Sequence, residues 1–161
     1  MAYRNLKNLV IENAKIMFAN FSGVEKQYNN EGERNFCVVI EDPIVAQQMK
    51  EDGWNVRLYM PRDPEERPFN YVQVKVSYQP ARFAPHIYTY KGRVSTELDE
   101  ETVGQLDHAD ITNVDVVIRP REWEPGRIKA YVKEMHVMLE ESAFAHKYAN
   151  RDDEDEERIP F

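Results

Sequence analysis

The sequence lacks the features on which most catalytic and membrane functions depend. It has one cysteine, Cys37, and so cannot form an internal disulfide or a cysteine zinc cluster. Its longest apolar run, Phe36 to Ile40, is far shorter than the roughly 20 residues of a membrane-spanning helix, and residues 1–4 lead into no hydrophobic signal segment. Glycine-rich phosphate loops, nucleophile elbows and His-Glu-x-x-His motifs are also missing. We therefore expect a cytosolic, non-enzymatic protein with no cofactor and no membrane contact.

Asp107, His108 and Asp110 come nearest to a catalytic cluster. Carboxylates and imidazoles are ligands in divalent-metal nucleases. Their spacing matches no established metal motif, and they directly follow a predicted helix, where such residues usually cap and solvate. We assign no metal site, and a nuclease stays an alternative that predicts magnesium-dependent loss of substrate and dependence on Asp107 or Asp110.

The 161 residues, of which 42% are hydrophobic and 31% charged, suit one globular domain. The net charge of −8 at first opposes a nucleic-acid partner, because lysine and arginine must replace the counterions along phosphate. Residues 151–161 hold −4 of that charge, so a DNA-binding surface on the rest must be a local basic stripe. We expect a domain over residues 1–140, a linker over 141–150 and a disordered acidic tail over 151–161.

Apolar and polar residues alternate in several short segments, which is typical of strands. The predicted strands cover residues 9–20, 35–40, 54–60, 71–78, 86–90, 113–119 and 128–139. Two short helices are expected, one capped by Asp42 and ended by Gly53 and one capped by Asp99. The apolar parity of the last strand switches near Lys133 and Glu134, which predicts a bulge. This pattern favours a mainly β fold, an OB-fold-like barrel of five or more strands, closed or partly open.

Aromatic and cationic side chains share the polar faces of several predicted strands. Single-stranded nucleic acid needs this mixture, because bases stack on flat rings while lysine and arginine follow the phosphates. Tyrosine and lysine also simply cover the solvated side of many sheets, and for any single pair we weight that interpretation about twofold higher. Several pairs on one barrel shift the balance toward binding. The candidate contacts are Arg34, Phe36, Arg57, Tyr59, Tyr71, Lys75, Arg121, Trp123, Lys129, Tyr131 and Lys133.

Two of these aromatic assignments have open alternatives. Trp123 lies in a turn between two predicted strands, where it is either a stacking platform or a plug over the barrel end. Phe36 faces either the core or the binding groove, because a register shift of one residue moves its side chain to the other face.

The acidic tail ends in an apolar tip. A tail that serves only solubility needs no such tip. An acidic segment that ends in an aromatic residue with a free carboxylate fits a peptide ligand that enters a pocket of a partner protein. The partner-binding residues are predicted to be Asp152, Asp153, Asp155, Ile159, Pro160 and Phe161.

The terminal DDEDEERIPF is similar to the acidic tip of bacterial single-stranded DNA-binding proteins, which docks replication and repair enzymes. The body resembles instead a phage and prophage family of single-stranded DNA-binding proteins with an OB-fold. This resemblance rests on the stretches IENAKIMFANFSG, GERNFCVVI, EDGWNVRLYMPRD, YVQVKVSY, LDEETVGQLDHADITNVDVVIRP and IKAYVKEMHV. It implies sequence-independent binding and protection of single strands during phage replication or recombination, in the cytoplasm of a bacterial host. It implies no oligomeric state.

A second interpretation belongs to another class of protein. An acidic interaction protein, or a DNA mimic, would bind a host replication or repair factor without binding DNA. The net charge of −4 on residues 1–150 favours this interpretation, and the mixed aromatic and basic faces oppose it.

Overall fold

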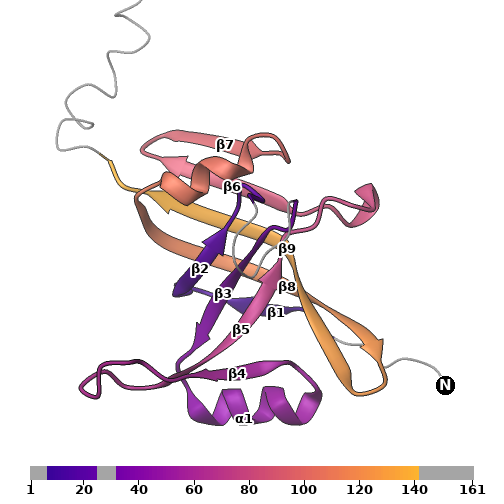
Figure 1. Cartoon of the computed structure of the whole chain (residues 1–161). Coiled ribbons are helices and arrows are strands. Elements are labelled where there is room, and N and C mark those ends of the chain that lie inside the picture. The colour runs from indigo at the N-terminus through magenta and orange to yellow at the C-terminus, as the bar shows by residue number, and fades with distance from the viewer. Residues whose placement is uncertain (1–6, 25–31, 142–161) are drawn as a thin grey trace, which may run out of the picture.

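Nine strands bend around one apolar core in a computed structural model that describes residues 7–24 and 32–141 (Figure 1). The strands are β1 Leu9–Ile11, β2 Ile16–Asn20, β3 Asn35–Ile40, β4 Val56–Tyr59, β5 Phe69–Lys75, β6 His86–Lys91, β7 Val94–Leu98, β8 Ile111–Glu124 and β9 Arg127–Leu139. The helices are α1 Pro43–Asp52 and two 3-10 helices, η1 Ala81–Phe83 and η2 Val103–His108. Within the described residues the sheet does not close on itself, and the prediction of a mainly β, OB-like, partly open fold is confirmed.

The sheet runs in the order β1-β8-β9-β5-β3-β2, with β4 beside β5 and the β6–β7 hairpin beside β9. Strand β9 serves both halves of the sheet, because its first part pairs with β5 and its second part with β6. Its register against β8 shifts between the pairs Ile118–Val132 and Val117–Glu134, which leaves Lys133 as the extra residue. The predicted bulge is therefore confirmed, and it lets both parts of β9 turn apolar side chains inward.

The core is built from side chains of both halves of the sheet. Phe21 and Phe36 are fully buried with ring centroids 5.4 Å apart. Val74 from β5, Ile118 from β8 and Met135 from β9 complete the centre of the same cluster. At about 25 cal/mol per Å² of buried apolar surface, such side chains supply the main force that holds the strands together.

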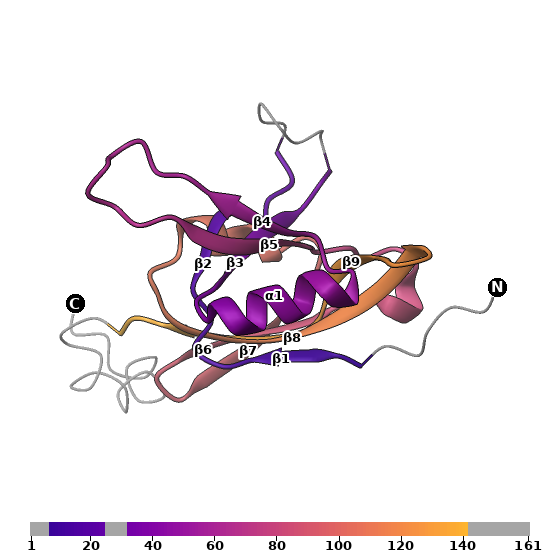
Figure 2. The ribbon, with the colours of Figure 1, turned by 90° about the horizontal axis from the view of Figure 1, so that it is seen from below.

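Helix α1 lies across one end of the sheet, as the view from below shows (Figure 2). The Asp42 side chain accepts a hydrogen bond of 2.9 Å from the Ile44 amide, and Gly53 ends the helix with a left-handed backbone, φ 106°. Both predicted caps are confirmed. Ala46 and Met49 are buried and fix the helix against the core.

Three elements differ from the sequence-based expectation. The predicted strand over residues 9–20 is divided into β1 and β2, because Asn13 adopts a left-handed backbone, φ 52°. Strand β7 was not predicted, since it exposes every residue except Leu98 and so shows no alternation. Asp99 does cap a turn, accepting from the Thr102 amide at 2.9 Å, but the helix that follows is of the 3-10 type. No helix among the described residues is long and apolar enough to cross a membrane.

Candidate functional site

Most of the predicted contact residues lie on one outer surface of the sheet, which we call the outer basic face. It is formed by β4, β5, β9 and the distal half of β8. The residues between them along the strands, such as Val72, Val74 and Ala130, are buried in the core, so the candidates point outward. Three pairs face each other across neighbouring strands: Arg57 and Tyr71, Lys75 and Tyr131, and Arg121 and Lys129. Tyr59, opposite Phe69, and Trp123 continue the face at its two ends.

A groove of about 490 Å³ opens on this face. Its walls are the turn after α1, β4, β5 and the tip of the β8–β9 hairpin. Among the described residues, the charged side chains that line it are all cations: Lys50, Arg57, Lys75, Arg127 and Lys129. The groove is therefore a local positive site on an acidic protein, as a binding site for phosphates requires.

Trp123 stands on the rim of the groove. Trp123 is 41% exposed, which favours the interpretation as a stacking platform over that of a plug at the barrel end. The Lys129 ammonium lies 4.9 Å and the Arg127 guanidinium 5.7 Å from the indole centroid. The Arg127 Nε is also 3.7 Å from Glu124 Oε2. Both cations lie over the indole ring, so positive charge and an exposed flat ring occur together, as in sites where a base stacks while cations hold its phosphate.

A second group of rings and cations continues the face along β9. The Arg119 guanidinium lies 4.4 Å from the Phe83 centroid and 5.6 Å from the Tyr131 centroid. Arg82 lies 4.9 Å from the same Phe83 ring, which is 42% exposed. Sequence reasoning missed Phe83 because it belongs to a 3-10 turn, where no strand alternation marks the outward side. Arg119 lies on a predicted strand, but its place on the outer basic face follows only from the register, in which it pairs with Tyr131.

Four rings form what we call the aromatic cluster: Phe18, Tyr59, Phe69 and Tyr71. Tyr59 and Phe69 stack at 4.9 Å, and Phe69 meets Tyr71 edge-on at 6.4 Å. Phe18 lies 5.5 Å from Tyr59 and 6.3 Å from Tyr71. Its φ of 53° is left-handed, which costs a residue with a side chain about 1–2 kcal/mol. Simple alternation along β2 would place Phe18 on the same side as Ile16, but an irregularity between Met17 and Asn20 turns its ring outward.

The assignment of Phe36 to nucleic-acid contact is wrong. Phe36 is fully buried and pairs with Val74, on the core side of β3. The sequence could not decide this, because all six residues of β3 are buried and both faces of the strand therefore look apolar.

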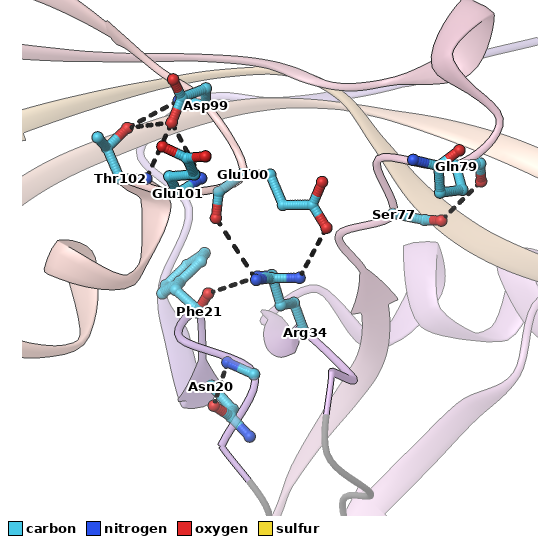
Figure 3. Close-up of polar contacts among 10 residues, drawn as sticks. Asn20, Phe21, Arg34, Ser77, Gln79, Asp99, Glu100, Glu101 and Thr102 are labelled. Atoms are coloured by element: carbon cyan, nitrogen blue, oxygen red, sulfur yellow. Dashed lines mark hydrogen bonds and ion pairs between the residues drawn. The ribbon is translucent and has the colours of Figure 1, made fainter.

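Arg34 makes structural contacts that its sequence pattern did not reveal (Figure 3). Its Nε donates to the Phe21 carbonyl at 3.1 Å, and its guanidinium reaches the Glu100 carbonyl at 3.4 Å and the Glu100 carboxylate at 3.6 Å. The side chain is only 17% exposed. Arg34 thus ties the end of β2 to the turn before η2, and its contact with DNA stays a prediction. Lys133 is exposed at the β9 bulge, and its contact with DNA stays a prediction.

Both carboxylate oxygens of Asp107 accept hydrogen bonds from the backbone. Its Oδ1 accepts from the Phe21 amide and its Oδ2 from the Ser22 amide, both at 2.8 Å. Across the described ranges no three His, Cys, Asp or Glu side chains are grouped so that they could hold a metal ion. The thiol of Cys37 is likewise poor in reactivity, because burial raises its pKa to about 11 against the opposing effect of Arg57.

We expect Asp107→Ala to lower the free energy of unfolding by about 2–3 kcal/mol, because two amides lose a charged acceptor. Urea denaturation measures this loss. Asp110→Ala is the matched control, since Asp110 is exposed, and its effect should stay within about 0.5 kcal/mol. A stable Asp107→Ala variant that has lost a magnesium-dependent nuclease activity would support the nuclease alternative instead.

The predicted partner-binding residues of the tail lie outside the described residues, and their role stays a prediction. They are Asp152, Asp153, Asp155, Ile159, Pro160 and Phe161.

Comparison with known proteins adds one family and two structures. A family model described as a putative phage ssDNA-binding domain matches residues 1–160. The single-stranded DNA-binding protein from bacteriophage Enc34 in complex with ssDNA is similar in structure, with a TM-score of 0.52 and 13% identity over 85% of this chain and 89% of that one. The structure of a C-terminal truncation of the same bacteriophage protein has a TM-score of 0.50 and 12% identity, over 84% of this chain and 87% of that one. At these identities the two structures show a shared fold. No curated protein matches.

Proposed function

The chain belongs to the putative phage ssDNA-binding domain family, and from this we propose that it binds single-stranded DNA without sequence preference along the outer basic face. The observation that carries the proposal is the groove, in which five cations and Trp123 meet and every charged lining residue described is positive. The structural relative in complex with ssDNA, which shares the fold, supports the same conclusion.

The cationic side chains would bind the phosphates and the aromatic side chain would bind a base. Lys50, Arg57 and Lys75 follow the phosphates through the groove, and each neutralised phosphate releases counterions. Trp123 receives a base by stacking, with Lys129 beside it. Stacking and phosphate contacts do not distinguish one base from another, because every base has a flat face and every nucleotide a phosphate. Binding is therefore independent of sequence.

The biological role proposed is that of a non-enzymatic coat protein. It would cover and protect single strands during phage replication or recombination, in the cytoplasm of the bacterial host. The acidic tail, residues 151–161, would recruit replication or repair proteins, with Phe161 entering a pocket and the acidic residues steering the approach. The similarity of this tip to that of bacterial single-stranded DNA-binding proteins supports the assignment.

The proposal is tested by titrating the full chain with a fluorescent dT oligonucleotide and with a matching duplex at two salt concentrations. We expect a preference for the single strand, weaker at higher salt, with quenching of tryptophan fluorescence. Trp123→Phe should remove most of that quenching, whereas Trp54→Phe should remove less, because Trp54 also lines the groove but is less exposed than Trp123. Absence of binding to either DNA would overturn the proposal and favour the acidic interaction protein. Equal binding to the duplex would contradict the preference for single strands.

A further inference from the structure

The most unusual residue of the described surface is Phe18. It combines a left-handed backbone, φ 53°, with a ring that is 53% exposed. Glycine or asparagine adopts such a backbone at little cost, whereas a bulky residue rarely does. A residue that is both strained and solvent-exposed contributes little to the core, and such outliers are concentrated at ligand sites.

The strain arises from a bulge in β2. Met17 pairs with Cys37 and Asn20 with Asn35, so two residues of β2 stand opposite one residue of β3. The bulge turns the Phe18 ring onto the outer side of the sheet, where it meets Tyr59 and Tyr71. The bulge itself does not need a phenylalanine, because a residue without a Cβ would fit its backbone better.

Covering the outer side of β3 from solvent explains only part of the position of the Phe18 ring. Cys37 and Val39 point to the outer side of β3 and are 6% and 7% exposed, which is consistent with cover by the aromatic cluster. About half of the Phe18 side chain nevertheless remains in contact with solvent. The exposed part is available to a ligand.

The aromatic cluster is continuous with the groove. Tyr71 stands opposite Arg57 in the pairing of β4 and β5, and the Arg57 side chain lines the groove. A strand that lies along the groove therefore reaches the four rings at the end of β5 that is distant from Lys75. The rings contact mainly one another, whereas the groove is lined by cations, so the two parts of the face offer different chemistry to the same strand.

We propose that the aromatic cluster is a separate subsite of the outer basic face that takes an unpaired nucleobase by stacking, and that Phe18 is the residue that contacts it. This inference rests on the proposed function and assigns to the cluster a base other than the one stacked on Trp123, while the cations of the groove hold the phosphates. A duplex hides the faces of its bases inside the helix and so cannot use the cluster. A strand of abasic nucleotides keeps its phosphates but has no base to stack.

The test compares wild type and Phe18→Gly with two ligands of equal length, a dT oligonucleotide and an abasic oligonucleotide. Phe18→Gly should bind dT about tenfold more weakly, bind the abasic strand with unchanged affinity, and keep the wild-type dependence of affinity on salt. Its melting temperature should stay close to that of wild type, because relief of the backbone strain offsets the lost ring contacts and the greater freedom of glycine in the unfolded chain. Phe18→Asn, which also tolerates this backbone, should behave in the same way.

Val10→Ala is the matched control, because Val10 is 63% exposed on β1, outside the outer basic face, and it should bind both ligands as wild type does. Wild-type affinity of both Phe18 variants for dT would overturn the inference and favour a protein-docking role for the rings. A lower melting temperature in both variants, with equal losses for both ligands, would overturn it in favour of a structural role. If wild type itself fails to bind dT, the proposed function fails, which is a different result.

Discussion

Replacing Lys75 and Lys129 together by glutamate is expected to weaken the binding of a dT oligonucleotide by about a hundredfold or more at low salt. The two residues line the groove from different strands, β5 and β9, and each variant carboxylate would repel the phosphates that the ammonium attracts. The loss should shrink as salt rises, since ions screen exposed charges over about 10 Å at 0.1 M. Fluorescence titration over a series of salt concentrations measures both effects.

The corresponding alanine variants separate lost attraction from added repulsion. Each phosphate contact contributes about 0.7 to the slope of log affinity against log salt for single strands, so Lys75→Ala with Lys129→Ala should lower that slope by about 1.4. Lys91→Glu is the control, because Lys91 is exposed on the β6–β7 hairpin and does not line the groove. Equal losses for Lys91→Glu and for Lys75→Glu alone, which change the net charge by the same amount, would mean that net charge, and not this groove, governs binding.

Phe36→Ala is expected to lower the free energy of unfolding by about 3–5 kcal/mol. The ring is fully buried and packs on Phe21 in the centre of the core, so its removal leaves a cavity that the surrounding strands cannot fill. For a domain of this size such a loss is a large part of the total stability. Urea denaturation followed by circular dichroism measures it.

Phe36→Leu distinguishes a core residue from a contact residue. Leucine keeps most of the apolar volume, so this variant should remain folded and should bind dT with wild-type affinity. A folded Phe36→Leu variant with weakened binding would return Phe36 to the binding site. Trp123→Leu is the useful comparison, because it removes the stacking platform from an exposed position and should leave stability almost unchanged.

The parity of the strands made much of the outer basic face predictable. In β5 and β9 one set of alternate residues is apolar and buried, so Tyr71, Lys75 and Lys129 had to point the other way. The switch of parity at Lys133 also located the bulge of β9 from sequence alone. Alternation is informative wherever a strand has one buried and one exposed side.

The same rule fails where that condition does not hold. Both sides of β3 are buried, so Phe36 carried no signal, and almost all of β7 is exposed, so the strand itself carried none. The outward direction of Phe18 could not be predicted for a different reason. A bulge moves a side chain to the other side of the sheet without changing the local composition. The groove could not be predicted from the sequence either, because Lys50 and Arg127 come together only in the tertiary fold.

The pairing of β1 with β8 has a consequence for the synthesis of the protein. Leu9 pairs with Ile118, so β1 must wait until about a hundred further residues have been translated before its partner exists. At about 5–20 residues per second this delay lasts several seconds. The groove is completed later still, because Ile128 and Lys129 form one of its walls. A nascent or prematurely terminated chain that stops before β9 therefore lacks that wall of the groove.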